Sequence, residues 1–132
     1  IDAAVLSIFK TQFDVIIINH GLHYFPDPIE YVQTARSFLV PGGRLFLLNL
    51  IFYKNPAQRI QQIEQQSTAF EREHGYSHFL HPSRGYMDMQ DHDDMVKMGL
   101  DVRSYPVMWR ANLKARWKPA APRYCYGILQ VD

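Results

Sequence analysis

Two apolar runs with a helix signal between them constrain the fold of this chain more than any other feature. Phe13–Asn19 (FDVIIIN) and Arg44–Ile51 (RLFLLNLI) are apolar at nearly every position, which is typical of strands buried on both faces of a parallel sheet. Parallel strands need a crossover connection, which is right-handed in nearly all known sheets. The sequence therefore predicts a strand, a helix and a parallel strand around one hydrophobic core.

The segment between the two runs carries clear helix signals. Asp27 stands where an N-cap residue is expected, Pro28 follows at the first helical position, and Glu30 lies three residues after the cap. The run Pro41-Gly42-Gly43 is predicted to end this helix. Its apolar face is predicted from residues at helical spacing: Tyr31, Val32, Ala35, Phe38 and Leu39.

Two more helices are predicted after the second run. A Gln-rich helix is expected over residues 55–72, on the surface or as a lid, because its apolar stripe is thin. A loop rich in glycine, proline and histidine follows at His74–Gly85. Asp88, with Asp91 three residues later, can cap a helix that ends at Gly99. The inward residues of that helix are predicted to be Met95, Val96 and Met98.

The remaining segments predict a short helix and a closing hairpin. Ile1–Lys10 has apolar residues at helical spacing. Asp101–Val107 and Arg123–Val131 are predicted to form an antiparallel pair of strands, with Met108–Pro122 as a long connection. Together the elements fit a single domain over residues 1–132, a size that one hydrophobic core supports.

The composition argues against several classes of partner. The chain has 14 Lys and Arg and 13 Asp and Glu, so we expect no nucleic acid and no membrane as partner. Leu45–Tyr53, the longest apolar stretch, is far shorter than the roughly 20 residues of a membrane helix, and Ile1–Gln12 lacks the pattern of a signal peptide. The single cysteine, Cys125, lies in an apolar run and is interpreted as a buried strand residue rather than a nucleophile. We therefore expect a cytoplasmic protein.

The region Phe13–Leu50 resembles the part of class I, Rossmann-like S-adenosylmethionine-dependent methyltransferases that follows their cofactor-binding half. The family pattern there is a buried strand, a polar tip, an L-H-[HY]-aromatic turn, a capped helix ending in L-x-P-G-G, and another strand. Downstream, GYMDMQDHDDMVKMGLDVRSYPV and RYCYGILQV resemble the family's later helix with strand six and its final antiparallel strand. The first region carries the resemblance at Asp14, Asn19, Leu22, His23, Tyr24, Pro26, Asp27, Leu39, Pro41, Gly42 and Gly43.

This resemblance implies an α/β fold with a three-layer methyltransferase sheet, of which the chain holds the carboxy-terminal portion. Strands four and five would be parallel, and strands six and seven would form the closing hairpin. The family holds its cofactor with a glycine-rich loop after the first strand and an acidic residue after the second. Only 12 residues precede Phe13 and none is glycine, so the amino-terminal cofactor-loop half is expected to be lacking.

The missing half has consequences for activity and partners. We expect the isolated chain to be inactive, because the glycine-rich loop supplies most contacts to the cofactor. The strands would also show an unprotected sheet edge. A missing amino-terminal segment or a second copy of the chain is expected to cover that edge, so a homo-oligomer is one expectation.

By resemblance, the turn after the first run holds the site. S-adenosylmethionine is the implied cofactor and a small molecule the implied methyl acceptor. His20 or His23 could remove a proton from the acceptor, although His23 could instead only pack the turn. Tyr24 and Tyr53 are candidates for contact with the acceptor. The methionine end of the cofactor would be lined by Asn19, Gly21 and Leu22.

Three other patterns are explained without a site. His74, His78 and His81 have a spacing that could hold zinc on a helix, but a loop is favoured there, so no metal is expected. The cluster Asp91-Asp93-Asp94 could suggest calcium, but a charged first helical turn explains it. Aromatic and basic residues alternate over Trp109–Lys118, as in some single-stranded nucleic acid sites, but an acceptor-specificity loop or a solvated connection is favoured.

Two classes of function stay open. One is a methyltransferase acting on a small-molecule acceptor. The other is a non-catalytic interaction module that kept the methyltransferase sheet, lost the cofactor loop and binds a partner through its exposed edge. A receiver-type signalling domain is set aside, because Asn19 stands where its phosphoacceptor aspartate would be.

Overall fold

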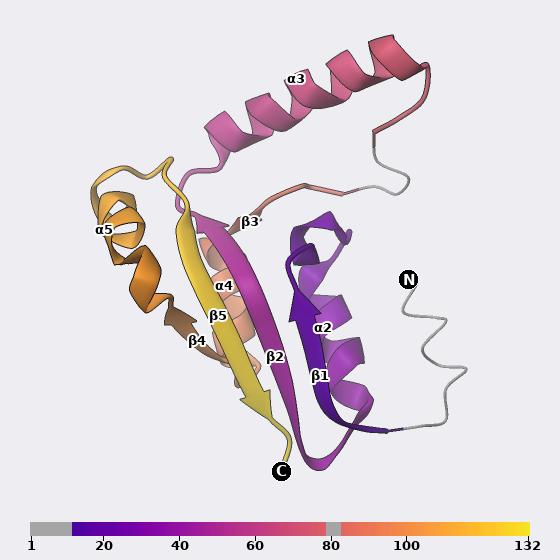
Figure 1. Ribbon diagram of the computed structural model, residues 1–132, viewed down its shortest axis with the longest axis vertical. Coiled ribbons are helices and arrows are strands. Elements are labelled where there is room, and N and C mark those ends of the chain that lie inside the picture. Colours follow the sequence, from indigo (N-terminus) through magenta and orange to yellow (C-terminus); the bar gives the residue numbers. More distant parts are fainter. Residues whose placement is uncertain (1–11, 79–82) are drawn as a thin grey trace.

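The computed structural model describes residues 12–78 and 83–132 and shows an open, mixed sheet with helices (Figure 1). The sheet order is β1-β2-β5-β4, and the short β3 pairs with the end of β2. The predicted helix at Ile1–Lys10 lies outside the described residues. In chain order the elements are β1 (Phe13–Asn19), η1 (Leu22–Tyr24), α2 (Pro28–Ser37), β2 (Leu39–Tyr53), α3 (Ala57–His74), β3 (Met87–Asp88), α4 (Met89–Lys97), β4 (Asp101–Ser104), η2 (Pro106–Met108), α5 (Trp109–Trp117) and β5 (Arg123–Gln130).

The predicted strand, helix and parallel strand are confirmed. Residues Val15–Asn19 of β1 pair in parallel with Arg44–Leu48 of β2, and α2 connects the two strands. The side chain of Asp27 caps α2, because it accepts hydrogen bonds from the backbone N–H groups of the second and third helical residues. Local signals in the sequence therefore determine where this helix begins.

The end of α2 differs from the prediction. The helix ends at Ser37, and Leu39 already pairs with β1 as the first residue of β2. Pro41-Gly42-Gly43 therefore belongs to the start of the strand, and the prediction that it ends the helix is wrong. A side chain at Gly43 would place its Cβ 2.8 Å from the carbonyl oxygen of Val40, so the close backbone contact in this reversal requires glycine.

The carboxy-terminal hairpin is present, and the connection between its strands contains a helix. β4 and β5 are antiparallel, and β5 lies between β2 and β4. β4 ends at Ser104 rather than at Val107, because Pro106 opens the 3₁₀ turn η2. The predicted connection Met108–Pro122 holds α5, which has no side-chain cap. No capping residue in the sequence marks the start of this helix, although its alanine, leucine, lysine and arginine residues favour helix.

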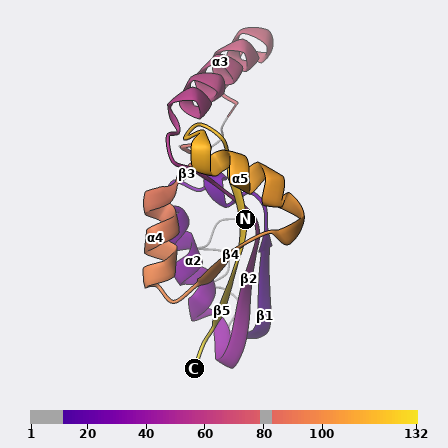
Figure 2. The same cartoon turned by 90° about the vertical axis from the view of Figure 1, so that its left-hand side faces the viewer.

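Helices α2 and α4 cover one face of the sheet, as Figures 1 and 2 show. α5 instead packs near the start of β5. These layers agree with the predicted open α/β sheet, and a third layer would lie on the face that α2 and α4 do not cover. The core between the two helices and the sheet includes Val32, Leu45, Leu47, Leu50, Phe52 and Met95.

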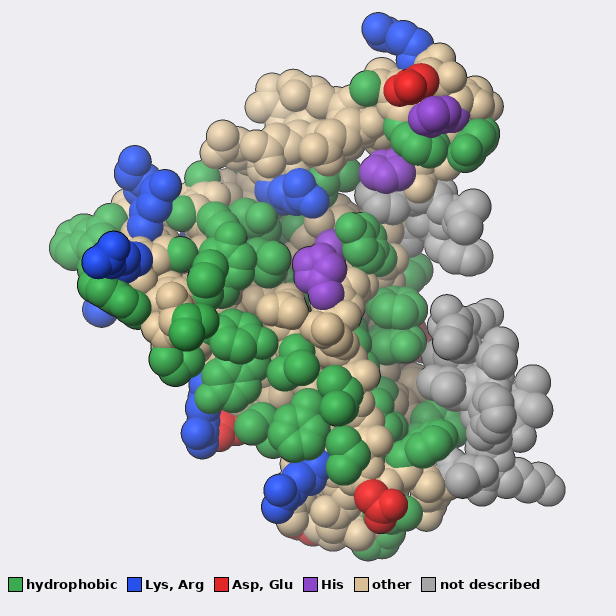
Figure 3. Space-filling view, viewed as in Figure 1, with side chains coloured by type: hydrophobic (Ala, Val, Ile, Leu, Met, Phe, Trp, Pro, Cys, Tyr) green, Lys and Arg blue, Asp and Glu red, His purple; other side chains and the backbone are tan. Residues whose placement is uncertain are grey.

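One face of β1 is exposed, so the prediction that both apolar runs are buried on both faces is wrong. Ile16 and Ile18 pack against the core, whereas Val15 and Ile17 are 49% and 61% exposed. Burial in β2 alternates in the same way. We call the uncovered side the open face; Figure 3 shows it as a broad hydrophobic surface. Strand register aligns Ile17 with Phe46 of β2 and Ile128 of β5.

The two remaining predicted helices are confirmed, with one correction. α3 has no buried residue and projects beyond the sheet, as expected for a surface helix (Figure 1). The predicted pair Asp88 and Asp91 forms a reciprocal cap at the start of α4. Met95 is fully buried and Met98 packs against the core, but Val96 is 46% exposed because it lies on the side of α4 that faces away from the sheet. Its predicted inward position is therefore wrong.

Candidate functional site

The turn that follows β1 gathers polar groups at the carboxyl end of the parallel strand pair. His20 and Gly21 both have left-handed backbone conformations, with φ angles of 57° and 89°. The N–H of His20 donates to the carbonyl oxygen of Leu48 at 3.0 Å, and η1 begins directly after Gly21. Open α/β sheets bind their ligands outside this end of their strands. The predicted site residues of the turn therefore lie where a ligand site is expected.

His23 lies deepest among the polar side chains of this turn. The residue is only 9% exposed, and its ring centroid lies 5.1 Å from that of His20 and 4.1 Å from that of Tyr24. Its carbonyl oxygen accepts hydrogen bonds from the Ser83 hydroxyl at 3.0 Å and the Gly85 N–H at 3.2 Å. These contacts fit the interpretation that His23 packs the turn.

Burial also changes the acid–base chemistry of His23. Burial, assisted by the neighbouring His20 and Arg59, lowers the pKa of His23 from 6.5 to about 4. The imidazole is therefore neutral at neutral pH and is a weak proton acceptor. His20, by contrast, is exposed, so its imidazole is the more accessible of the two to a ligand.

A chain of hydrogen bonds links β1 and β2 to Tyr105, the residue that follows β4. The side-chain amide of Asn49 donates to Asn19 Oδ1 at 2.8 Å, and the backbone N–H of Asn49 donates to the Tyr105 hydroxyl at 3.1 Å. Asn49 has a φ of 56° and lies where the register between β2 and β5 shifts. Such a register shift is typical of a β-bulge, which changes the direction in which a side chain points. Sequence reasoning missed Asn49 and Tyr105 as site residues; the signal was an asparagine inside an apolar strand.

The residues proposed for cofactor contact differ in accessibility. Asn19 is exposed and Gly21 is half-buried, but Leu22 is 2% exposed and its side chain packs in the core. A Cβ added at Gly21 would meet only Tyr24 Cδ2, at 3.7 Å, so the surface beside this glycine is open. Asn19 and Gly21 are therefore accessible to a ligand, whereas the side chain of Leu22 is not.

The two acceptor candidates lie in η1, which follows β1, and at the end of β2. Tyr24 is 51% exposed, and Tyr53 is half-buried at the end of β2, where burial raises the pKa of its hydroxyl. The sequence neighbours of Tyr53 line a cavity of about 540 Å³ that the sequence did not reveal. Its lining consists of Phe52, Lys54, Ser104, Tyr105, Pro106, Trp109, Asn112, Leu113, Ala115, Arg116, Ala121 and Arg123.

The other sequence patterns have structural roles. His74 and His78 pack with their rings around Phe70, and His81 lies outside the described residues. Within residues 12–78 and 83–132, no three His, Cys, Asp or Glu side chains are grouped to hold a metal ion. Asp91 caps α4 and forms an ion pair with Arg84 at 2.6 Å, which explains this acidic residue without calcium.

Cys125 is confirmed as a core residue of β5. It is fully buried, and burial raises the pKa of its thiol, so little thiolate forms at neutral pH. A search of the described part of the chain for a helix long and apolar enough to cross a membrane finds none.

Comparison with known proteins places this geometry in a family. Residues 2–84 match the methyltransferase domain family. A ubiquinone biosynthesis O-methyltransferase of Vibrio cholerae is 25% identical over 100 residues, which cover 70% of this chain and 38% of the relative. A thiopurine S-methyltransferase of Vibrio vulnificus is 33% identical over 107 residues, which cover 72% of this chain and 48% of the relative. The chain thus spans less than half the length of these two relatives.

Solved structures show the same fold. An O-methyltransferase family protein from Burkholderia thailandensis superimposes with a TM-score of 0.50 at 19% identity, covering 99% of this chain and 33% of that one. The plantazolicin methyltransferase BpumL, solved in complex with SAH, gives a TM-score of 0.52 at 12% identity, covering 100% of this chain and 57% of that one. The family match covers more than half of the chain and the fold agrees with it, so this chain belongs to the methyltransferase domain family.

Proposed function

We propose that this chain is the acceptor-side part of an S-adenosylmethionine-dependent methyltransferase that acts on a small molecule. The observation that carries the proposal is the turn Asn19–Tyr24, which presents polar groups at the ligand-binding end of a sheet of this family. Membership of the family supports methyl transfer as the reaction, because the relatives named above are an O-methyltransferase and an S-methyltransferase.

The residues of the turn would align the acceptor and take up its proton. When bound, S-adenosylmethionine supplies a methyl group on a sulfonium that a nucleophile can displace. Such a displacement depends mainly on alignment, and a base helps where the acceptor loses a proton. We assign the base to His20, whose left-handed backbone holds the exposed imidazole at the edge of the turn. The hydrogen bond from Asn49 fixes Asn19 beside it.

The open face supports a second part of the proposal. An amino-terminal half that carries the glycine-rich loop would cover Val15 and Ile17 and complete the cofactor site. The relatives are long enough to contain such a half, because the matched region is only 38% to 48% of their length. The 132 residues alone would then be inactive. A second copy of the chain on this face is the competing outcome.

A non-catalytic interaction module is the second candidate function. The observation that favours it is the open face itself, since apolar side chains such as Ile17, at 61% exposure, mark a surface that binds another surface. Such a module would bind its partner through this face without affinity for the cofactor. Cofactor binding therefore separates the two functions.

The test uses the complete gene product that contains these residues. We expect S-adenosylhomocysteine to bind it in a calorimetric titration. His20→Asn keeps a residue type that tolerates the left-handed conformation but removes the imidazole. We expect this variant to lower kcat by about 100-fold or more, with the Kd for S-adenosylhomocysteine changed less than about threefold.

The control is His23→Gln, which is expected to reduce kcat much less than His20→Asn does. Unchanged turnover in His20→Asn would refute the assignment of the base. If the complete gene product does not bind S-adenosylhomocysteine at all, the proposed activity is wrong and the interaction module is the better explanation.

A further inference from the structure

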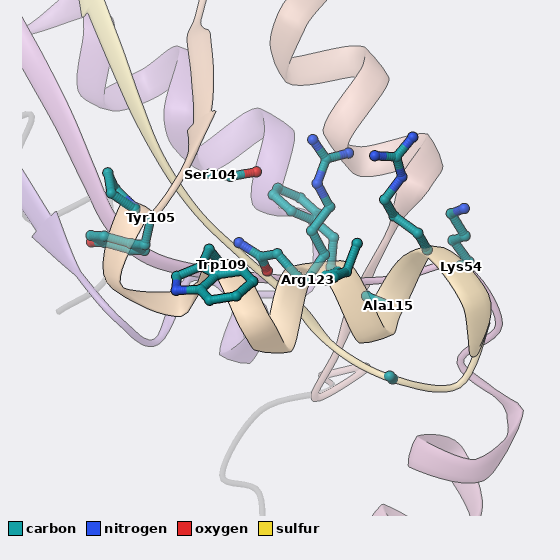
Figure 4. A pocket seen from close by; sticks show the side chains of 12 residues that line it. Lys54, Ser104, Tyr105, Trp109, Ala115 and Arg123 are labelled. Atoms are coloured by element: carbon teal, nitrogen blue, oxygen red, sulfur yellow. The ribbon is translucent and has the colours of Figure 1, made fainter.

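The cavity of about 540 Å³ lies at the same end of the sheet as the polar turn, and nothing in the proposed function uses it. Its floor is formed where β2 ends and β5 begins, and α5 closes one side (Figure 4). The volume is within the roughly 300–1,000 Å³ that is usual for small-ligand sites. The cavity is therefore large enough for a small aromatic molecule.

The charged side chains that line the cavity are all positive. Lys54, Arg116 and Arg123 line it, and none of the described lining residues is an aspartate or glutamate. Among the residues that the structure describes, none of these three cations forms an ion pair with a carboxylate, whereas Arg84 and Lys97 do. The whole chain has a net charge of only +1, so this concentration of positive charge is local. A cavity of this kind favours an anion, and arginine matches the geometry of carboxylate and phosphate groups.

The apolar part of the lining favours a ring. Phe52 is fully buried in the floor, while Tyr105 and Trp109 stand along the side that Figure 4 shows. Trp109 is 58% exposed, and the Arg110 guanidinium lies over its ring at 5.3 Å from the centroid, so an entering ring would pack against the exposed part of the indole. The lining thus combines cations with aromatic faces, as recognition of an aromatic oxyanion requires.

The helix over the cavity is held in place. The Asn112 side-chain amide donates to the Tyr124 carbonyl oxygen at 2.9 Å, and Asn112 Oδ1 accepts from the Tyr124 N–H at 2.7 Å. After the helix, the Asn55 N–H donates to the Pro119 carbonyl oxygen at 2.9 Å. These bonds fix α5 to β5 and to the end of β2, so the cavity exists before a ligand enters.

The cavity is also connected to the turn. Tyr105 lines the cavity, and its hydroxyl accepts the hydrogen bond from Asn49, which in turn donates to Asn19. Two hydrogen bonds therefore separate the wall of the cavity from the residue next to His20. A ligand anchored at the cations would be oriented relative to that turn.

We propose that this cavity binds the oxyanion of the methyl acceptor, a small aromatic molecule that carries a carboxylate or phosphate group, with Arg116, Arg123 and Lys54 around the anion and Trp109 against the ring. The identification of the ligand as the acceptor rests on the proposed function, whereas the binding of an aromatic oxyanion does not.

The test is an NMR titration of the complete gene product with benzoate, phenyl phosphate and the neutral analogue benzamide. The indole N–H of Trp109 reports on the cavity, and that of Trp117, which does not line it, is the internal control. We expect benzoate or phenyl phosphate to shift the Trp109 signal saturably and the Trp117 signal little, with benzamide binding about tenfold more weakly or worse.

Matched variants separate the site from general electrostatic attraction. Arg116→Glu reverses a lining charge, and Lys114→Glu makes the same change on the same helix outside the lining. We expect Arg116→Glu to raise the Kd of the anionic probe by about tenfold or more and Lys114→Glu to raise it by less than about twofold. Both variants are expected to be folded, as judged by their melting temperatures. The proposal would be overturned if both variants lost the same affinity for the anionic probe, or if benzamide bound as tightly as the anionic probes.

The outcomes distinguish the two proposals. If S-adenosylhomocysteine binds but neither anionic probe shifts Trp109, the anion site is wrong and the methyltransferase proposal is unaffected. If the probes bind at the cavity and S-adenosylhomocysteine does not, the cavity is an aromatic oxyanion site, and its ligand is not a methyl acceptor.

Discussion

Apolar side chains lie on both faces of the sheet, but the two faces differ in how far these side chains are buried. Leu45 and Leu47 on the covered face are fully buried under α2 and α4, whereas Val15 and Ile17 on the open face are 49% and 61% exposed. Burial, not residue type, determines how much an apolar side chain stabilises the fold. The covered face therefore stabilises the isolated chain, and the open face is available to stabilise an association.

The largest expected change in stability tests directly whether the covered face stabilises the chain more than the open face does. Leu47→Ala is expected to lower the free energy of unfolding by about 3 kcal/mol, because it leaves a cavity in the core, whereas Ile17→Ala is expected to lower it by less than about 1 kcal/mol. Urea denaturation of the 132-residue chain measures both values. Similar losses in the two variants would show that the open face is covered in solution, and sedimentation would then show whether a second copy covers it.

A somewhat smaller loss of folding stability is expected when the pH falls and His23 becomes protonated. The pKa of His23 is about 4 in the folded chain against 6.5 as its ordinary value, so the unfolded chain binds the proton more tightly. Stability from this group is fully present above pH 6.5 and is lost as the pH falls towards 4, by about 2–3 kcal/mol in total.

The measurement compares urea midpoints of the parent chain and His23→Gln between pH 4 and pH 7.5. The parent is expected to lose more stability than the variant over that window. An NMR titration of the His23 ring that gives a pKa near 6.5 would contradict the buried, neutral state described for this turn.

The smallest of the three expected losses of stability concerns the cap of α4, one of the two helices that cover the sheet. Asp91 is 7% exposed, accepts the Asp88 N–H at 2.8 Å and pairs with Arg84 at 2.6 Å. Asp91→Asn is expected to lower the free energy of unfolding by about 1–2 kcal/mol, since it removes the charge but keeps an oxygen for the cap. Thermal unfolding measures the loss.

The matched control is Asp94→Asn on the same helix, whose partly exposed side chain pairs with Lys97 and Gln90. It is expected to change stability less than Asp91→Asn does. The reverse order would mean that the cap is not what holds α4 on the covered face.

Much of the fold was predictable because its signals are local. The cap at Asp27, the reciprocal pair Asp88 and Asp91, and the two apolar runs act within a few residues of their own positions. The candidate site was predictable only in part. The turn Asn19–Tyr24 follows directly from the end of β1, whereas the interaction of Asn19 with Asn49 depends on a register shift between two other strands.

The sequence alone determined the order of β1, α2 and β2, the parallel pairing of these two strands and the position of the polar turn. Only the tertiary structure decided which side of each apolar run is buried, how α5 closes the cavity, and that His23 is deep while His20 is exposed. The reason is physical: caps and turns depend on neighbouring residues, but burial and cavities depend on which distant surfaces pack together.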